Sequence, residues 1–444
     1  MSPRRLAAAA TAAADGRMLT ALCAALCWRV LLQPVRAQVD ATALVRIPVG
    51  LILSPDSRQM NASFRYGLRN LAPSSSWQTH WRLDAVTEFT DTGNSFDIER
   101  AICRELETGI FVLIGATQTS SFPTMQSYTD SFQLPMLTPG SPAHHSVEEQ
   151  DHYQVYMRPD YSTALYDIIR YYGWDYVYYL YTCDEGLLNL ERLFILMGPR
   201  SNTLNVAARF LSPDNSTASQ LLKYLNDADD KMALRRIIID SRSLESTQRV
   251  MDLLADANMT TKYYHYVIAS FASEELNLQK FGHEGANVTG LRILERSGRA
   301  LRDFYNKGDW EGARQESSGR GGASQHKLMY EAALIYDSLR VIHAAFSRLL
   351  EASPTALKRH LRRGEVYNNG SRGIGNCDAD RVVPFEAGNR ILSTIKQVSL
   401  ENGLSGNIAF DEHGRRVNYT IYIWEYTLNR EKTKQQFKFK CVCG

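Results

Sequence analysis

The densest group of side chains able to hold a metal ion lies in the segment HHSVEEQDHY. Its candidate ligands are His144, His145, Glu148, Glu149, Asp151 and His152. Imidazole and carboxylate groups are common zinc ligands, but the order here is not the HExxH pattern that places two histidines on one helical face. Pro and Ser residues surround the segment, which favours a solvated polar loop. A metal-dependent hydrolase is kept as an alternative, and it would fail if the protein purified free of metal.

Other motifs that carry chemistry are absent or incomplete. The terminal CVC pair, Cys441 and Cys443, has no second cluster beside it. The stretches GRGG and GSRGIG follow no predicted strand, and they lack the Lys and hydroxyl of a phosphate-binding loop. There is no GxSxG elbow and no thiol-protease signature. We therefore predict no metal, no cofactor and no enzyme activity, and we favour binding or assembly.

The charge balance and the first 37 residues indicate the compartment. The chain has 50 basic and 48 acidic residues, which gives no bulk attraction to nucleic acid or to an acidic membrane surface. An apolar run from Met18 to Leu32 is followed by small residues at Val35 and Ala37, so we predict a signal peptide over residues 1–37. The run is shorter than the roughly 20 residues that span a bilayer. As written, the chain is expected to be secreted.

Sequons and cysteines agree with an extracellular chain. Six Asn-X-Ser/Thr sequons mark possible glycosylation sites at Asn61, Asn215, Asn258, Asn287, Asn369 and Asn418. Without the signal peptide, the remaining cysteines are Cys103, Cys183, Cys377, Cys441 and Cys443. This odd number leaves at least one thiol unpaired within the chain or paired between chains in an oxidising compartment.

The pattern of apolar residues predicts an α/β protein with two lobes. At 444 residues the chain exceeds the roughly 250 to 300 residues at which one core stops growing. Strands are predicted at Val45 to Ser54, at Trp81 to Phe89 and from Ile110, with helices at Asn61 to Leu71 and Phe96 to Leu106. This βαβαβ order predicts a parallel sheet that is covered on both faces.

A second alternation of helices and strands begins after the segment YMRPD. It is followed by a long helix from about Ser324 to Leu350, with an apolar stripe at steps of three and four, and by a hairpin within residues 404–426. Two such lobes and a closing helix are typical of a clam-shell binding domain. Its ligand would lie in the cleft at the carboxyl ends of the strands.

Several segments then resemble the amino-terminal domain of ionotropic glutamate receptor subunits, most closely an invertebrate AMPA-type member. In chain order they are FRYGL, RPDYSTALYDIIRYYGWDYVYYLY, DEGLLNLERLF, LNLQKFGHEGANVTG, YEAALIYDSLRVIHAAF and LSGNIAFDEHGRRVNYT. They cover about residues 45 to 426. The resemblance implies an α/β fold of the bilobed, clam-shell periplasmic-binding-protein type I, with two parallel-sheet lobes joined by three crossings of the chain.

The resemblance also implies borders for the two lobes. The membrane-distal lobe is expected at 45–157 and 287–378, the membrane-proximal lobe at 158–286 and 379–428, and a C-terminal stub at 429–444. In this family an agonist-binding domain and a channel follow, and here neither does. The chain is therefore interpreted as a fragment, a truncated splice form or an incomplete gene model.

The family's disulfide maps onto Cys103 and Cys377. Closing so long a loop would contribute about 4 to 5 kcal/mol as an upper figure, and Cys183 would be free and partly buried. The family's dimer faces map onto the helices that begin at Phe96 and Leu187. Phe96, Leu187 and Phe194 are therefore the candidate dimer contacts, although each could equally belong to the core of its own lobe.

The function implied is that of a receptor ectodomain and not of an enzyme. It would form homo- or heterodimers with other glutamate receptor subunits on the extracellular side of the postsynaptic membrane, and so direct assembly of a glutamate-gated cation channel. Secreted or adhesion proteins of the synapse could touch it, and it would meet the membrane only through the missing domains. An alternative is an amino-acid sensor of the same fold. The hydroxyls of GATQTSSF, residues 115–122, could then bind the ligand.

Overall fold

The structure is a computed structural model. It describes residues 45–71, 74–76, 79–115, 120–140, 152–198, 204–211, 218–220, 222, 234–306, 328–353, 361–362, 365–366, 377, 382–426 and 437–440. The predicted signal peptide lies outside these residues. The chain from Leu44 onward forms one compact unit. Among the helices of the described part, none has both the length and the hydropathy to cross a bilayer.

The first sheet has the strand order β2-β3-β1-β4-β5-β6. Its strands are β1 (Val45–Leu53), β2 (Ser74–Ser76), β3 (Thr79–Phe89), β4 (Val112–Gly115), β5 (Met136–Thr138) and β6 (Gln154–Tyr156). Only the short β2 pairs antiparallel, and the other pairs are parallel. The middle strands β1 and β4 are almost entirely buried, as their continuous apolar sequence predicts.

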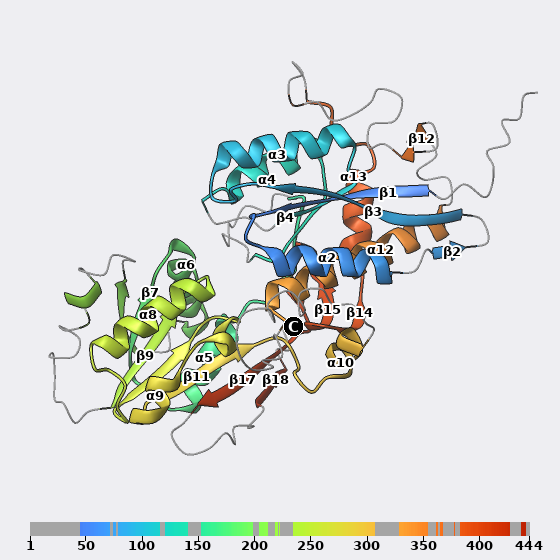
Figure 1. Ribbon diagram of the computed structural model, residues 1–444. Helices are drawn as coiled ribbons and strands as arrows, with labels where there is room; N and C mark the ends of the chain where they lie inside the picture. Colours follow the sequence, from blue (N-terminus) through green and yellow to red (C-terminus); the bar gives the residue numbers. More distant parts are fainter. Residues whose placement is uncertain are drawn as a thin grey trace, which may run out of the picture. The chain divides into compact units, whose positions relative to one another are not determined.

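Helices cover both faces of this sheet. Those packed around it are α2 (Arg58–Asn70), α3 (Ser95–Thr108), α4 (Phe122–Phe132), α12 (Tyr330–Ala352) and α13 (Gly388–Lys396). In Figure 1, α3 lies on one side of β1 and β3, and α2 and α12 lie on the other. The stripe predicted on the long helix is buried from Ala332 to Leu349. It therefore packs as core, as its spacing indicated.

The second sheet has the order β18-β17-β11-β10-β9-β7-β8. Its strands are β7 (Tyr176–Tyr181), β8 (Asn205–Phe210), β9 (Arg235–Asp240), β10 (Tyr264–Ile268), β11 (Asn287–Arg292), β17 (Thr420–Tyr426) and β18 (Phe437–Lys440). The helices of this part are α5 (Ser162–Tyr171), α6 (Asp184–Met197), α8 (Leu244–Asp256) and α9 (Gln279–Glu284). Helix α10 (Arg299–Asn306) packs instead on α2 and α12, because the ring of Phe304 lies 4.8 Å from that of Tyr66 and 5.1 Å from that of Tyr336. The strands from β7 to β11 are parallel, whereas β17 and β18 pair antiparallel. The two sheets confirm the predicted α/β fold class.

The expected border at residue 287 is wrong. Strand β11 begins at Asn287 and pairs with both β10 and β17, so it belongs to the second sheet. Its sequence, NVTGLR, reads poorly as a strand because it contains Gly290. The structure requires this glycine, because a Cβ there would collide with the indole of Trp424. The chain therefore leaves the second sheet after Arg292.

The border expected at residue 379 is also wrong. Helix α13 packs against α12, and the ring of Phe385 lies 5.3 Å from that of Phe111, beside β4. Strands β14 (Leu400–Gly403), β15 (Gly406–Phe410) and β16 (Arg416–Val417) form a separate three-stranded sheet. Residues 382–417 thus precede the last passage to the second sheet, which follows at residues 418–419.

The predicted hairpin forms, but it ends earlier than its alternating pattern indicated. Strands β15 and β16 pair antiparallel, with Ala409 opposite Val417. Asn418 has a φ of 53° and interrupts the extended chain. From Thr420 onward, β17 joins the second sheet beside β11. A single alternating run therefore supplies strands to two sheets.

A buried carboxyl group lies inside the first lobe. Glu105 on α3 is fully buried, and its Oε1 accepts a hydrogen bond of 3.0 Å from the backbone N–H of Leu51. Its other oxygen lies over Gly50, where any side chain would collide with it. Burial raises the pKa of Glu105 well above its usual value. Burial between a strand and a helix thus favours the neutral form of this carboxyl group.

This shift predicts a pH dependence of stability. The stabilising contribution of Glu105 is fully present below its unfolded pKa of 4.5, and it is lost as the pH rises from there toward the raised pKa of the folded state. Relative to Glu105→Gln, the natural chain should lose unfolding free energy as the pH rises. Urea unfolding of both proteins between pH 4 and pH 8 checks this. Parallel pH profiles would show that Glu105 keeps an ordinary pKa.

Candidate assembly surface and hinge

The predicted disulfide between Cys103 and Cys377 is present. Their Cα atoms are 5.7 Å apart, and 274 positions of sequence separate them. The bridge fastens α3 to the segment that precedes α13. Cys183 is free and half-buried, as expected, and burial raises the pKa of its thiol. Cys441 and Cys443 lie outside the described residues.

The predicted contact on α3 is exposed. Phe96 lies in the first turn of the helix, and 58% of its surface is accessible. Its backbone N–H donates to the side chain of Asn94, which caps the helix. The guanidinium of Arg100 lies 4.5 Å from the centre of the Phe96 ring. An aromatic side chain is thus held at the surface by a cation, which is typical of a contact residue.

The outer face of α6 is apolar. Leu187 and Phe194, both predicted contacts, are 49% and 47% exposed, and Ile195 is 64% exposed. The helix also has a complete buried stripe, which includes Leu190 and Leu193. These buried residues pack α6 against its own lobe. The exposed apolar residues are therefore additional to the core, which is the expected signature of a binding face.

A shallow hollow of about 550 Å³ lies along this outer face. It is lined by Leu187, Leu188, Leu190, Glu191, Phe194 and Ile195. We call these six residues the α6 face. The structure thus brings Leu187 and Phe194 together on one surface, whereas Phe96 lies on a different helix packed against the other sheet.

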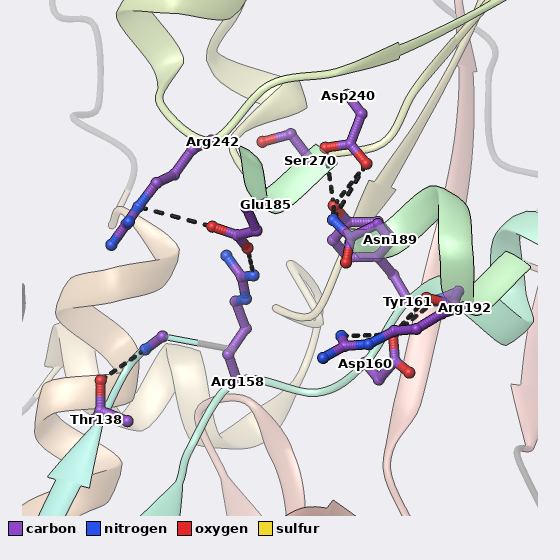
Figure 2. A network of polar contacts seen from close by, with 12 residues as sticks. Thr138, Arg158, Asp160, Tyr161, Glu185, Asn189, Arg192, Asp240, Arg242 and Ser270 are labelled. Atoms are coloured by element: carbon purple, nitrogen blue, oxygen red, sulfur yellow. Dashed lines mark hydrogen bonds and ion pairs between the residues drawn. The ribbon is translucent and has the colours of Figure 1, made fainter. Parts of the chain in front are cut away.

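A buried carboxylate holds the inner side of α6 to the second sheet. Asp240, at the end of β9, accepts hydrogen bonds from Tyr161 at 3.1 Å and from Asn189 of α6 at 3.1 Å (Figure 2). It also accepts one from Tyr179 of β7. Asp240 is only 2% exposed, and burial raises its pKa. Three donors from three elements therefore converge on one acceptor. Sequence reasoning missed this cluster.

The first crossing, residues 157–161, is bonded to the same helix. Arg158 forms a buried ion pair with Glu185 in the first turn of α6, and Arg242 lies 3.8 Å from the other oxygen of Glu185. Asp160 lies 3.9 Å from Arg192 of α6 (Figure 2). The inner side of α6 is thus held by charges on the crossing as well as by Asp240.

The last crossing, residues 418–419, is bonded to the first. The buried guanidinium of Arg416 donates to the carbonyl of Met157 at 2.9 Å and to that of Asn407 at 2.6 Å. The hydroxyl of Tyr419 donates to the carbonyl of Asp160 at 2.8 Å. Burial lowers the pKa of Arg416 to about 10, so it remains charged at neutral pH. The two crossings are therefore joined to each other by hydrogen bonds.

A cavity of about 1150 Å³ opens at the carboxyl ends of the strands, where the sequence predicted a cleft. Thr92 follows β3, and Arg242 follows β9. Ser120, in the segment proposed to bind an amino acid, also lines the cavity, whereas residues 116–119 lie outside the described part. Both basic and acidic side chains line the cavity, so it could accept a zwitterion.

The six sequons differ in their surroundings. Asn258 and Asn418 are exposed in turns, with φ values of 57° and 53°. Asn61 is partly buried on α2, and Asn287 is partly buried at the start of β11. The remaining two, Asn215 and Asn369, lie outside the described residues. Glycosylation at these positions stays a prediction, and among the four described acceptors Asn258 and Asn418 are the most accessible.

The structure describes His152 but not the other five candidate metal ligands, so the predicted cluster stays untested. Within the described part of the chain there is no group of three His, Cys, Asp or Glu side chains that could hold a metal ion. His152 is described, and its Nδ1 lies 2.9 Å from Asp130. The rest of the cluster, residues 144–151, falls outside the described residues.

Comparison with known sequences places the chain in a family. Residues 60–429 match the family described as receptor family ligand binding region. The match covers most of the sequence, so the chain belongs to this family of receptor domains. Its fold is that of the type I periplasmic binding proteins, as the sequence predicted, and the family is one of receptors and not of enzymes.

The relatives are glutamate receptors. A glutamate receptor of Lymnaea stagnalis is 28% identical over 396 residues, which cover 88% of this chain and 41% of the relative. Glutamate receptor 3 of Rattus norvegicus and glutamate receptor 3 of Homo sapiens are each 26% identical over 380 residues, which cover 85% of this chain and 40% of each relative. The chain thus spans about two fifths of the length of these relatives. The resemblance inferred from the motifs is confirmed.

Proposed function

We propose that this chain is the extracellular amino-terminal domain of an ionotropic glutamate receptor subunit, of the AMPA type, and that it directs pairing between subunits. The observation that carries the proposal is the α6 face. It exposes leucine, isoleucine and phenylalanine side chains although the helix has its own buried stripe. Phe96 on α3 supplies a second candidate contact.

The same proposal assigns the lobes and the partners. The first sheet with α3 forms the membrane-distal lobe, and the second sheet with α6 forms the membrane-proximal lobe. The partners are other glutamate receptor subunits, in homo- or heterodimers on the extracellular side of the postsynaptic membrane, and secreted or adhesion proteins of the synapse are further candidates. Gating by glutamate would require the agonist-binding and channel domains of such a receptor.

Polar substitution of the α6 face should weaken association. In the variant Leu187→Asp/Phe194→Asp, two desolvated apolar contacts become charges, so we expect the dissociation constant of the dimer to rise at least about tenfold. Sedimentation velocity at tens of micromolar measures this. Tyr171→Asp is the control, because Tyr171 is 60% exposed but lies on α5. Equal association of the natural chain and the double variant would contradict the proposal.

A second candidate function is an amino-acid sensor, which the cavity at the strand ends supports. Its lining includes the guanidinium of Arg242, the carboxylate of Glu331 and the hydroxyl of Ser120. These groups could face the carboxylate and the ammonium of a free amino acid. Titration calorimetry with a panel of amino acids separates the two candidates. Tight binding of any one of them would show that the domain is more than an assembly module.

A further inference from the structure

A carboxylate stands in the middle of the α6 face. Glu191 is exposed and lines the same hollow as Leu187 and Phe194. It lies one helical turn after Leu187 and one turn before Phe194 and Ile195, so these side chains project from the same side of the helix. Glu191 is therefore at the centre of the apolar surface and not at its rim.

This carboxylate has no partner within the described part of the chain. No hydrogen bond or ion pair to Glu191 occurs there, whereas the other charged groups of α6 are either paired or terminal. Glu185 is bound by Arg158, and Arg192 turns inward, 5% exposed, toward Asp160. Asp184 lies at the first position of the helix. After the first turn of α6, Glu191 is thus the charged residue that is exposed to solvent.

Pairing of two identical copies through this face would be unfavourable. A two-fold interface is self-complementary, so a residue at the centre of the shared face meets its own copy. Two Glu191 carboxylates would then approach each other while apolar surface around them excludes water. Both like-charge repulsion and loss of hydration oppose this arrangement. A partner with a cation at the same place would remove both costs.

We propose that Glu191 selects the partner of the α6 face, and that the preferred partner is a related receptor chain presenting Lys or Arg opposite Glu191 rather than a second copy. The inference rests on the proposed function, because it assumes that the α6 face is a subunit contact. The inference adds to that function a requirement on the partner, namely a cationic side chain opposite Glu191. Identical copies associate weakly, and charge complementarity favours the mixed dimer.

The test uses the full chain in three forms: natural, Glu191→Gln and Glu191→Lys. Glutamine is close in size and removes only the charge, so Glu191→Gln should self-associate about tenfold more tightly than the natural chain. A mixture of the natural chain with Glu191→Lys, one of them fluorescently labelled, should form mixed dimers about tenfold tighter than either homodimer. Sedimentation velocity measures all four dissociation constants. Equal thermal unfolding of the three forms verifies that each is folded.

Each outcome of this test has a defined meaning. If Glu191→Gln weakened the homodimer, the carboxylate would have a favourable contact in the second copy, and the proposal would be overturned. It would also be overturned if all forms associated equally while Phe194→Asp abolished association, although the proposed function would then stand. If Phe194→Asp changed no association, the α6 face would not be the subunit contact, and the proposed function itself would fail. If no form associated, the mixture included, the proposal on Glu191 would be overturned, although pairing with other subunits would stand.

Discussion

Replacing Cys103 and Cys377 together by serine is expected to lower the free energy of unfolding by about 2 to 5 kcal/mol. The bridge links residues separated by 274 positions, so its loss frees a very long loop in the unfolded chain. It also releases α3, which carries Phe96, from the segment before α13. Urea unfolding of the secreted protein under oxidising conditions measures the loss.

Cys183→Ser is the matched control for this measurement. Cys183 is free and only half-buried, so its replacement should cost far less than removal of the bridge. Reduction of the natural chain should reproduce the effect of the double variant and leave the double variant unchanged. If the double variant and Cys183→Ser unfolded at the same urea concentration, the bridge would contribute no stability.

The second large loss of unfolding free energy is expected when Asp240 is replaced. The variant Asp240→Ala leaves the hydroxyls of Tyr161 and Tyr179 and the amide of Asn189 buried without their acceptor. Loss of such a buried network should reduce the free energy of unfolding by about 3 to 5 kcal/mol. Because Asn189 lies on α6, the variant should also weaken self-association. Chemical unfolding and sedimentation of the same preparation measure the two effects.

Two further variants separate this network from a general loss of charge. Asp240→Asn keeps one carbonyl oxygen as an acceptor, so it should fall between the natural chain and Asp240→Ala. Asp175→Ala removes an exposed carboxylate that pairs with Arg236 at the surface, and it should have a much smaller effect. Equal stability of Asp240→Ala and Asp175→Ala would show that Asp240 is not a structural anchor.

The sequence predicted those parts of the fold that depend on local pattern. The segment VLIG of β4 is a continuous apolar run and forms a buried parallel strand. The stripe on α12 is buried at the predicted steps. Strand β11 was not among the predicted strands, and the border that the resemblance implied at residue 287 separated it from its sheet. Gly290 weakens its strand pattern, although Trp424 requires a glycine there. The partner that imposes the glycine lies 134 positions away in the sequence, outside any local window.

The candidate contacts of α6 could be predicted from the sequence, whereas the buried polar network around Asp240 could not. Leu187 and Phe194 could be placed on the outer face because the resemblance to a family supplied their position, and their exposure agrees with it. Asp240, Tyr161 and Asn189 could not be joined from sequence, because they come from three separate elements. One signal was available. Asp240 directly follows the apolar run Ile237 to Ile239, where a charge is expected to be either exposed or paired.

Disulfide trapping on α6 tests the central claim, that this helix faces a sister subunit, most directly. In a background of Cys183→Ser, Cys441→Ser and Cys443→Ser, a cysteine replaces either Leu187 or, as the control, Tyr171 on α5, which is more exposed than Leu187. Mild oxidation of the secreted chain should convert Leu187→Cys to a covalent dimer and leave Tyr171→Cys monomeric. Equal trapping at both positions, or trapping at Tyr171→Cys alone, would contradict the assignment of α6 as the subunit contact.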